Sequence, residues 1–369
     1  MCRDIFVRKV QPGDDAAVWR VAKTLSILER YYFYYLTYKP HRTDALVAVD
    51  KEKVIGCVIP KVATLGGEKV GIVGGIFVDR AVQRKGVGKI LVDAALSRFR
   101  EEGCQTYYVL VNRYNSGSWN MFLHYGFTPF EFNEQFKDFG WRMLQLWLVN
   151  GYLWEPGTFI LRHTGTKNQI PREAAEGWHL LLAWFVFSFG ILAMQIVFGD
   201  PSPEAIPLIL GVAGTSILAH ELSHKLAAGF FRLKTVFKVW ESGLALGALL
   251  SFLGVGFFQY FYGSTFIQQR DWPYNKRISL MGLIYSVGPV ISLALASCFL
   301  GLTHWANTEW LATVGIFGAR INVNLALFNL LPIFPFDGFD GRKIFLWNKL
   351  VWSMLVVWLV LLLGVVRFS

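Results

Sequence analysis

The chain is short of cysteines and of charged side chains for its length. Its 369 residues include four cysteines, Cys2, Cys57, Cys104 and Cys298, which are scattered and show no Cys-x-x-Cys spacing. This pattern indicates neither a disulfide framework nor a thiolate metal site. Charged residues make up 17% of the chain and hydrophobic residues 54%, which is too apolar for an ordinary soluble protein.

No apolar signal-peptide region follows the first methionine. The chain begins Met-Cys-Arg-Asp-Ile-Phe-Val-Arg and continues into a polar segment of mixed charge. A secretory signal would need an uninterrupted apolar stretch here. We therefore expect the N-terminal domain to stay in the cytoplasm.

The apolar residues are concentrated in the second half. Residues 1–165 read as a soluble α/β domain, 166–176 as a linker and 177–369 as an all-α polytopic membrane domain. Five segments approach the roughly 20 residues that a bilayer requires. They are 177–199, 205–231, 279–303, 310–335 and 349–367.

The net charge of +10 is explained by the positions of basic residues beside these spans. Cytoplasmic loops of membrane proteins carry an excess of Lys and Arg. We therefore expect a lipid bilayer as partner and no nucleic acid. The flanking residues are Arg162, Lys167, Arg172, Arg232, Lys234, Lys238, Lys276, Arg277, Arg342 and Lys343.

Loop charge also predicts the topology of a multi-pass protein of the cell membrane. Loops 199–204 and 303–309 contain no Lys or Arg and are expected outside, whereas 232–238 is basic and expected inside. Two of the spans, 205–231 and 310–335, carry the polar motifs that are described in the next paragraphs. If both of these spans run inward, an odd number of spans separates them. Since 279–303 supplies one, the glycine-rich stretch 242–263 should make no net crossing, as a re-entrant loop or short hairpin.

The stretch His220-Glu221-Leu222-Ser223-His224 places ionisable side chains in the second apolar span. Such residues are costly in a bilayer and are usually functional. Two histidines at i and i+4 share one helix face and can bind one metal ion, with the intervening glutamate placed as a general base.

The second polar stretch is Asn329-Leu330-Leu331-Pro332-Ile333-Phe334-Pro335-Phe336-Asp337-Gly338. Pro332 and Pro335 should end the helix before Asp337. In sequence and order, this stretch and the HELSH motif resemble those of the site-2 protease family of intramembrane zinc metalloproteases. The resemblance covers about residues 177–369. Gly288-Pro289-Val290-Ile291-Ser292 is similar to the family's Gly-Pro-x-x-Asn element, with Ser292 in place of Asn.

This resemblance implies zinc-dependent cleavage of a membrane-spanning protein substrate. His220, His224 and Asp337 would bind Zn²⁺, and Asn329 would orient the substrate backbone. Glu221 would deprotonate the zinc-bound water and later protonate the leaving amine.

A second Asp-Gly pair leaves an alternative for the third ligand. Counting from Asn329 favours Asp337, which we prefer, whereas counting back from Trp347 favours Asp340. Residues 233–239 alternate as a strand would, and this strand could present an edge to which a substrate adds.

In the soluble half, a predicted strand at 69–78 is followed by a glycine-bearing turn and a helix over 90–102. We also expect a helix over 14–31, strands at 46–49, 54–58 and 107–112, and a helix over 116–124. Backbone N–H groups of such a turn, together with the start of the helix, form an anion site.

The segment from Val78 to Gly88 is similar to the acetyl-CoA signature of the GNAT acetyltransferase superfamily, and Asn115–Phe127 resembles its second motif. The resemblance covers about residues 4–165. It implies an α/β fold with a mixed twisted sheet splayed at the fourth and fifth strands, and acetyl-CoA as cofactor. The implied cofactor-binding residues are Phe77, Val78, Gln83, Arg84, Lys85, Gly86, Val87, Gly88 and Asn115.

The GNAT general-acid tyrosine falls at Phe122, which cannot donate a proton. Tyr125 and Tyr114 are nearby but not at the matching position. N-acetyltransferase activity and non-catalytic acyl-CoA sensing therefore both stay open. We expect a fused metalloendopeptidase; the alternative is a membrane-anchored N-acetyltransferase whose membrane half is an anchor or a zinc-binding sensor.

Overall fold

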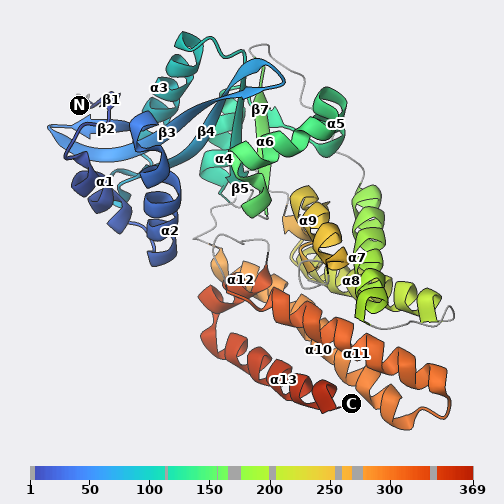
Figure 1. Ribbon diagram of the computed structural model, residues 1–369. Helices are drawn as coiled ribbons and strands as arrows, with labels where there is room; N and C mark the ends of the chain where they lie inside the picture. The colour runs from blue at the N-terminus through green and yellow to red at the C-terminus, as the bar shows by residue number, and fades with distance from the viewer. Residues whose placement is uncertain are drawn as a thin grey trace. The chain divides into compact units, whose positions relative to one another are not determined.

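The computed structural model describes residues 5–112, 115–155, 157–164, 176–198, 205–253, 260–267, 277–332 and 339–368. Backbone contacts divide the chain into two compact units (Figure 1). The soluble unit lies within residues 1–172. The membrane unit comprises residues 173–369, together with the short stretches 113–116 and 155–157.

The soluble unit is built on a seven-stranded mixed sheet in the order β1-β2-β3-β4-β5-β7-β6. Only β4 and β5 pair in parallel; the other neighbours are antiparallel. The strands are β1 Ile5–Lys9, β2 Leu46–Asp50, β3 Lys53–Leu65, β4 Glu68–Val78, β5 Thr106–Asn112, β6 Thr128–Pro129 and β7 Thr158–His163.

The sheet opens between β4 and β5, as expected. Their pairing ends at Val73 and Val109, although β4 continues to Val78 and β5 to Asn112. A bulge in the β3–β4 ladder falls at the same level, where Val58 pairs with Ile76 but Pro60 pairs with Val73. One extra residue in β4 bends the strand away from its neighbour.

Helices cover both faces of this sheet. On one face, α3 (Val87–Glu101) and α4 (Ser116–His124) contribute Leu91, Phe99 and Phe122 to the core. On the other face lie α1 (Asp14–Lys23), α2 (Ile27–Tyr31), α5 (Phe132–Phe139) and α6 (Met143–Asn150).

The prediction of a single helix over 14–31 is wrong in one respect, because the structure has two separate helices there, α1 and α2. The Thr24 hydroxyl donates to the Val21 carbonyl at 2.7 Å and ends α1. Ser26 and Glu29 then exchange side-chain and backbone hydrogen bonds of 3.4 and 3.1 Å. This reciprocal pair is a capping box, which starts α2.

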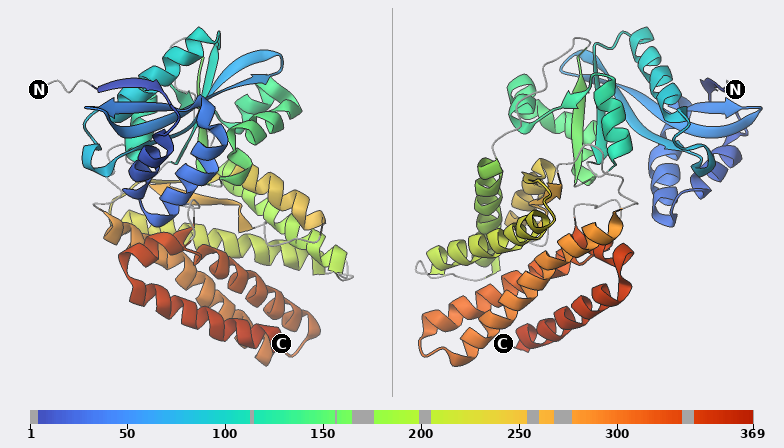
Figure 2. Two further views of the ribbon diagram at one scale, coloured as in Figure 1. Left: turned by 60° about the vertical axis from the view of Figure 1, so that its left-hand side comes forward. Right: turned by 180° about the vertical axis from the view of Figure 1, so that it is seen from behind.

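Among its described residues, the membrane unit has five helices long and apolar enough to cross a membrane. Figure 2 shows α10, α11 and α13 side by side, in agreement with their contacts. The prediction for the fourth span was too long: α11 ends at Asn329, because Pro332 disfavours helical backbone before it. The five are α7 Glu176–Phe198, α8 Ala205–Phe230, α10 Ile278–Trp305, α11 Glu309–Asn329 and α13 Lys349–Phe368.

A short hairpin element interrupts these helices between α8 and α10. Strand β8 (Thr235–Val239) is followed by α9 (Glu241–Phe252), and β9 (Gly263–Ile267) then pairs antiparallel with β8. The pairing brings the chain back beside β8; that this segment makes no net membrane crossing stays a prediction. The predicted strand over 233–239 is present as β8.

Candidate metal centre and acyl-CoA site

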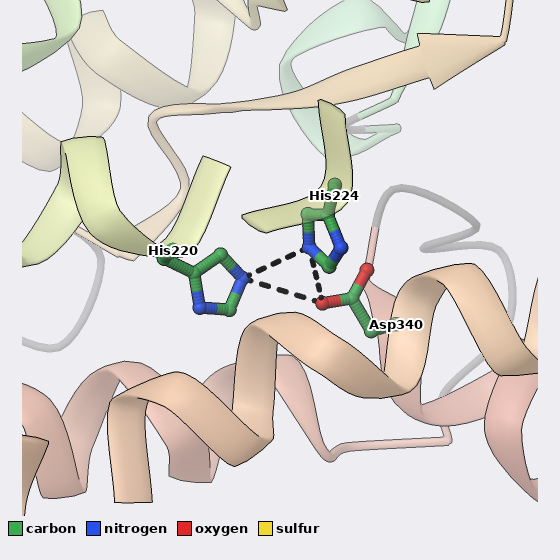
Figure 3. Close-up of side chains that lie close together, drawn as sticks. All are labelled: His220, His224 and Asp340. Atoms are coloured by element: carbon green, nitrogen blue, oxygen red, sulfur yellow. Dashed lines mark hydrogen bonds and ion pairs between the residues drawn. The ribbon is translucent and has the colours of Figure 1, made fainter. Parts of the chain in front are cut away.

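His220 and His224 project from one face of α8, as their i, i+4 spacing predicts (Figure 3). Their Nε2 atoms lie 3.3 Å apart, and the two ring planes are nearly perpendicular at 86°. Both side chains are 1% exposed. Two imidazole nitrogens that converge without solvent are suited to a shared ligand.

Asp340, the first residue of α12 (Asp340–Trp347), completes a three-residue cluster with these histidines. Its Oδ2 lies 3.3 Å from Nε2 of His220 and 3.1 Å from Nε2 of His224. Gly341 permits this placement, because a Cβ there would lie 2.2 Å from the carbonyl oxygen of Leu330. Asp337, the ligand that we preferred from the sequence, lies outside the described residues.

Partners on α10 orient the two rings. Nδ1 of His224 lies 3.2 Å from the Ile284 carbonyl oxygen, and Nδ1 of His220 lies 2.9 Å from Oγ of Ser292. Because a carbonyl only accepts, His224 donates from Nδ1 and keeps the lone pair of Nε2 directed into the cluster. Such outer contacts are typical of metal-binding histidines.

Gly288 leaves the space in which the rings meet. A Cβ at this position would lie 2.4 Å from Cε1 of His224 and 2.7 Å from Nε2 of His220. Real Cβ atoms do not approach other atoms this closely, so any side chain here would displace the imidazoles. The Gly-Pro element identified in the sequence therefore lies against the histidine pair.

The cluster fits a zinc ion in both chemistry and dimensions. Tetrahedral zinc with ligand bonds of about 2.0–2.1 Å requires ligand atoms roughly 3.3 Å apart. The three separations found here are 3.3, 3.3 and 3.1 Å. Oδ2 of Asp340 is also buried without a hydrogen-bond partner, which a cation would satisfy.

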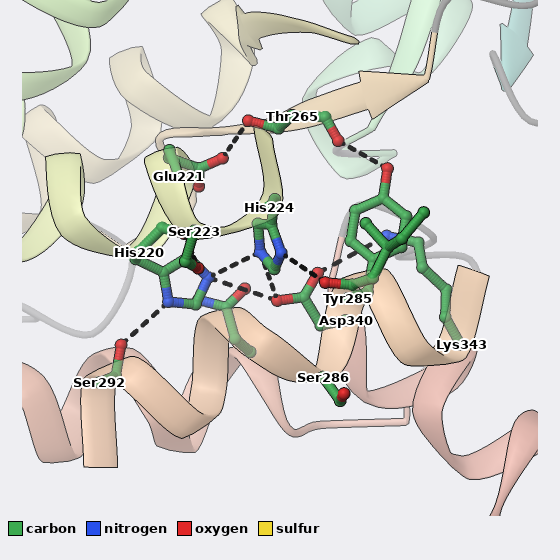
Figure 4. A network of polar contacts seen from close by, with 12 residues as sticks. His220, Glu221, Ser223, His224, Thr265, Tyr285, Ser286, Ser292, Asp340 and Lys343 are labelled. Carbon is green, nitrogen blue, oxygen red and sulfur yellow. Dashed lines mark hydrogen bonds and ion pairs between the residues drawn. The ribbon is translucent and has the colours of Figure 1, made fainter. Parts of the chain in front are cut away.

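Glu221 is held by the hairpin element rather than by its own helix (Figure 4). Tyr262 donates its hydroxyl to Oε1 at 3.0 Å, and Thr265 of β9 donates to Oε2 at 2.7 Å. Asn329, the last residue of α11, is buried, and its side-chain amide donates to the Leu325 carbonyl at 3.1 Å. A carboxylate has about four acceptor positions, so the two hydroxyl contacts orient Glu221 and still leave lone pairs for a proton.

These two partners of Glu221 were not predicted from the sequence. Tyr262 and Thr265 are 41 and 44 positions from Glu221, and nothing in their local sequence indicates the contact. Lys343 was interpreted only as a topological charge. It is fully buried, with Nζ 3.8 Å from Oδ1 of Asp340 and 3.8 Å from the centre of the Tyr285 ring.

The two outer edges of the hairpin differ in what covers them. The Phe237 N–H of β8 donates to the carboxylate of Glu176, at the start of α7, at 2.7 Å. The same carboxylate pairs with Lys225 of α8. On β9, the Thr265 carbonyl accepts the Tyr285 hydroxyl at 2.7 Å. The Tyr285 ring lies 5.1 Å from that of His224, so the β9 edge faces the metal cluster.

In the soluble unit, the turn before α3 has the backbone of an anion-binding loop. Arg84 and Gly86 both have positive φ, 62° and 88°. The side chains of Gln83 and Lys85 bond back to the carbonyls of Val78 and Ala81 at 3.3 and 3.0 Å. The side chains turn away, and the first N–H groups of α3 have no partner within the helix.

The remaining predicted cofactor residues surround the opened part of the sheet. Phe77 is buried against the Phe33 ring, and residues 76–78 of β4 pair with β3 alone among the described strands. The other edge of this segment is therefore available for hydrogen bonding to a pantetheine arm. Asn115 is exposed immediately before α4.

No tyrosine hydroxyl replaces the missing general acid in the described part of this site. Phe122 is buried and packs against Phe127. Tyr125 donates to the Lys89 carbonyl at 3.2 Å. Burial and a hydrogen bond to Asp93 raise the pKa of Tyr125 above its usual value. Tyr114 lies outside the described residues.

Comparisons with known proteins agree with both halves. The Acetyltransferase (GNAT) family profile matches residues 15–127. A protein of Methanocaldococcus jannaschii named "Putative zinc metalloprotease MJ0611" is 31% identical over 173 residues, 45% of this chain and 85% of that protein. A Synechocystis protein named "Putative zinc metalloprotease sll0528" is 29% identical over 191 residues, 50% of this chain and 44% of that protein.

Solved acetyltransferases resemble the soluble unit at low identity. Ard1 from Thermoplasma volcanium is 17% identical, with 43% of this chain and 96% of that chain covered and a TM-score of 0.30. The Escherichia coli ribosomal-protein-S18-alanine N-acetyltransferase is 13% identical, with 46% and 99% covered and a TM-score of 0.32.

The fold and the cluster thus define a helical, metalloprotease-like unit joined to a GNAT domain. The chain belongs to the zinc metalloprotease family represented by the archaeal relative, in agreement with the resemblance to site-2 proteases drawn from its motifs.

Proposed function

We propose that this protein is a zinc-dependent protease that cleaves a membrane-spanning protein within or near the bilayer. His220, His224 and Asp340 are the proposed ligands, with Asp340 in place of Asp337. The observation that carries the proposal is the buried triangle of two nitrogens and one oxygen at 3.1–3.3 Å.

In this proposal the residues around the cluster have separate roles in the reaction. Zinc, when bound, supplies Lewis acidity for a water molecule and for the scissile carbonyl. Glu221 accepts a proton at its carboxylate and returns it to the leaving amine. Tyr262 and Thr265 hold that carboxylate in place, and Asn329 is proposed to orient the substrate backbone.

The β9 edge is the proposed docking edge for an unwound substrate. The sequence suggested the strand over 233–239, but the carboxylate of Glu176 occupies the outer edge of that strand at Phe237. The β9 edge lies beside the cluster. On this edge the Tyr285 hydroxyl donates a hydrogen bond to the carbonyl of Thr265. A substrate strand would replace that hydroxyl with a backbone N–H.

We propose a multi-pass arrangement in the cell membrane with the soluble unit in the cytoplasm. The basic segment 232–238 would then lie inside and the loop 199–204 outside, as the distribution of Lys and Arg favours. Cysteine labelling of Arg232→Cys and Pro203→Cys in cells, with and without a membrane-permeant blocking reagent, tests this orientation.

Substitution of the base tests the protease proposal directly. Glu221→Gln should abolish cleavage of an identified membrane substrate and leave zinc content at the wild-type level. Cleavage that persists in Glu221→Gln would contradict the assigned role. A wild-type protein without zinc would favour the alternative in which the membrane half is an anchor.

We propose acyl-CoA binding by the soluble unit as a second function. The opened β4–β5 edge and the loop around Gly86 support it, whereas the buried Phe122 leaves transfer without an evident acid. Calorimetry should detect acetyl-CoA binding to the full-length protein. Thioester consumption in Glu221→Gln would establish transfer independent of proteolysis. Binding that alters the cleavage rate would support a sensing role.

A further inference from the structure

Helix α6 has apolar side chains on both of its faces. Its inner face packs Met143, Leu146 and Trp147 into the core. Its outer face, together with the preceding turn, presents Trp141 at 75% exposure and Leu148 at 57%. A helix that is apolar all round is normally covered on every side.

The exposed patch extends beyond α6. Phe136 of α5 is 44% exposed, and its ring lies edge-on to Trp141 at 5.7 Å. Leu144 and Val149 continue the patch along the helix, at 39% and 36% exposure. We call Phe136, Trp141, Leu144, Leu148 and Val149 the outer apolar face. Contiguous exposed apolar surface of this kind marks an interaction site.

Two basic residues, Lys137 and Arg142, are exposed beside the outer apolar face. The nearby acidic residues Glu134 and Asp138 share Arg162 as ion-pair partner, and the side chain of Asp138 is 40% exposed. Trp, Phe and Leu flanked by Lys and Arg form the composition that binds the headgroup region of an anionic bilayer.

The chain tethers the soluble unit to the membrane unit. The membrane unit begins at α7, and between α6 and that helix the structure describes the short helix η5 (Tyr152–Trp154) and β7. Five helices suited to crossing the membrane follow. A tethered surface meets its partner at high effective concentration, so a face too small to recruit a free protein suffices here.

We propose that the outer apolar face seats the soluble unit on the headgroup region of an anionic bilayer. The inference rests on the proposed membrane insertion but is independent of proteolysis and of acyl-CoA binding. Seating would limit the orientations of the soluble unit relative to the membrane unit. It would also fix which membrane-proximal surfaces the GNAT domain can reach.

Spin labels on the full-length protein in nanodiscs of anionic lipid test the proposal. With Cys2 and Cys298 replaced by serine, the label is placed at Leu144→Cys or Leu148→Cys. The control site is Glu101→Cys, exposed on α3 over the opposite face of the sheet. The ratio of oxygen accessibility to nickel-chelate accessibility should be about threefold or more above the control, as for interfacial positions.

A label at Val357→Cys, exposed on α13, separates failure of membrane insertion from failure of the inference. Nickel access there would mean that the proposed insertion has failed. If the label at Val357→Cys is protected from the nickel chelate, access of the chelate to the labels at positions 144 and 148 would overturn the proposed seating. Labels immobilised and closed to both reagents would also overturn it, in favour of a protein cover. Dipolar broadening that disappears on dilution with unlabelled protein would point to a second copy instead.

A second variant checks that these side chains provide the attachment. Trp141→Ser combined with Leu148→Gln, in the protein labelled at Leu144→Cys, should raise nickel access to the level of the control site. Both positions are solvent-exposed, so the substitutions should leave the soluble unit folded. Unchanged protection would contradict the proposal.

Discussion

Gly288 lies opposite the two imidazole rings, at a point where a methyl group would occupy the space between them. Gly288→Ala should therefore lower zinc affinity by at least about tenfold, because the rings must move apart. Competition with a chelator measures it. Gly301→Ala on the same helix is the control, since its Cβ would make only an ordinary 3.6 Å contact with Trp305. Equal zinc affinity in the two variants would refute this role of Gly288.

Ser292 fixes the orientation of His220 through a 2.9 Å contact with Nδ1. Ser292→Ala should weaken zinc binding by about tenfold, the lower end of the range for such outer contacts. Ser292→Asn should retain binding, since an amide can also partner the ring. Ser297→Ala, which removes a hydroxyl bonded only to its own helix, should leave zinc affinity unchanged. A loss in Ser297→Ala of the same size would show a general effect of α10.

Tyr262 and Thr265 are proposed as positioning residues for Glu221. Tyr262→Phe and Thr265→Val each remove one hydroxyl and should slow cleavage about ten- to a hundredfold, as small misplacements of a catalytic group do. Zinc content should stay at the wild-type level. The effect should appear in kcat and little in KM. A wild-type kcat in the variant that combines Tyr262→Phe with Thr265→Val would contradict the proposed role of these residues in positioning Glu221.

At the scale of elements, the start of α3 is the proposed binding site for the acyl-CoA pyrophosphate. Gly86 and Gly103 flank the two ends of α3, both with positive φ and open space around the Cβ position. Alanine at either site should cost about 1–2 kcal/mol of stability, the penalty for left-handed backbone. Only Gly86→Ala should also lower acetyl-CoA affinity, as measured by calorimetry. Matching losses of affinity in both variants would show that the effect arises from stability alone.

Sequence patterns predicted those elements whose signals are local. The histidine pair follows from its spacing on α8. The end of α11 at Asn329 was predicted too late, although Pro332 is a local signal for it. The break between α1 and α2 was also encoded locally, as Ser26 and Glu29, but was missed. The contacts of Glu221 could not be predicted, because Tyr262 and Thr265 reach it only after the hairpin folds back. The covered edge of β8 likewise depends on Glu176, far away in the chain.

At the scale of the whole molecule, two compact units share one chain. The division into a soluble α/β fold and a helical membrane unit was visible in the distribution of apolar residues. The choice of third ligand was not, because two Asp-Gly pairs lie three residues apart. Asp340 is the carboxylate that the described residues bring to the two histidines, and it stays the proposed ligand.

The zinc content of the detergent-purified protein and of two matched variants tests the proposed metal centre most directly. We predict about one zinc per chain in the wild type and in Asp337→Ala, and loss of zinc in Asp340→Ala. Retention in Asp340→Ala with loss in Asp337→Ala would reverse the ligand assignment. A folded wild-type protein without zinc would contradict the metal centre itself.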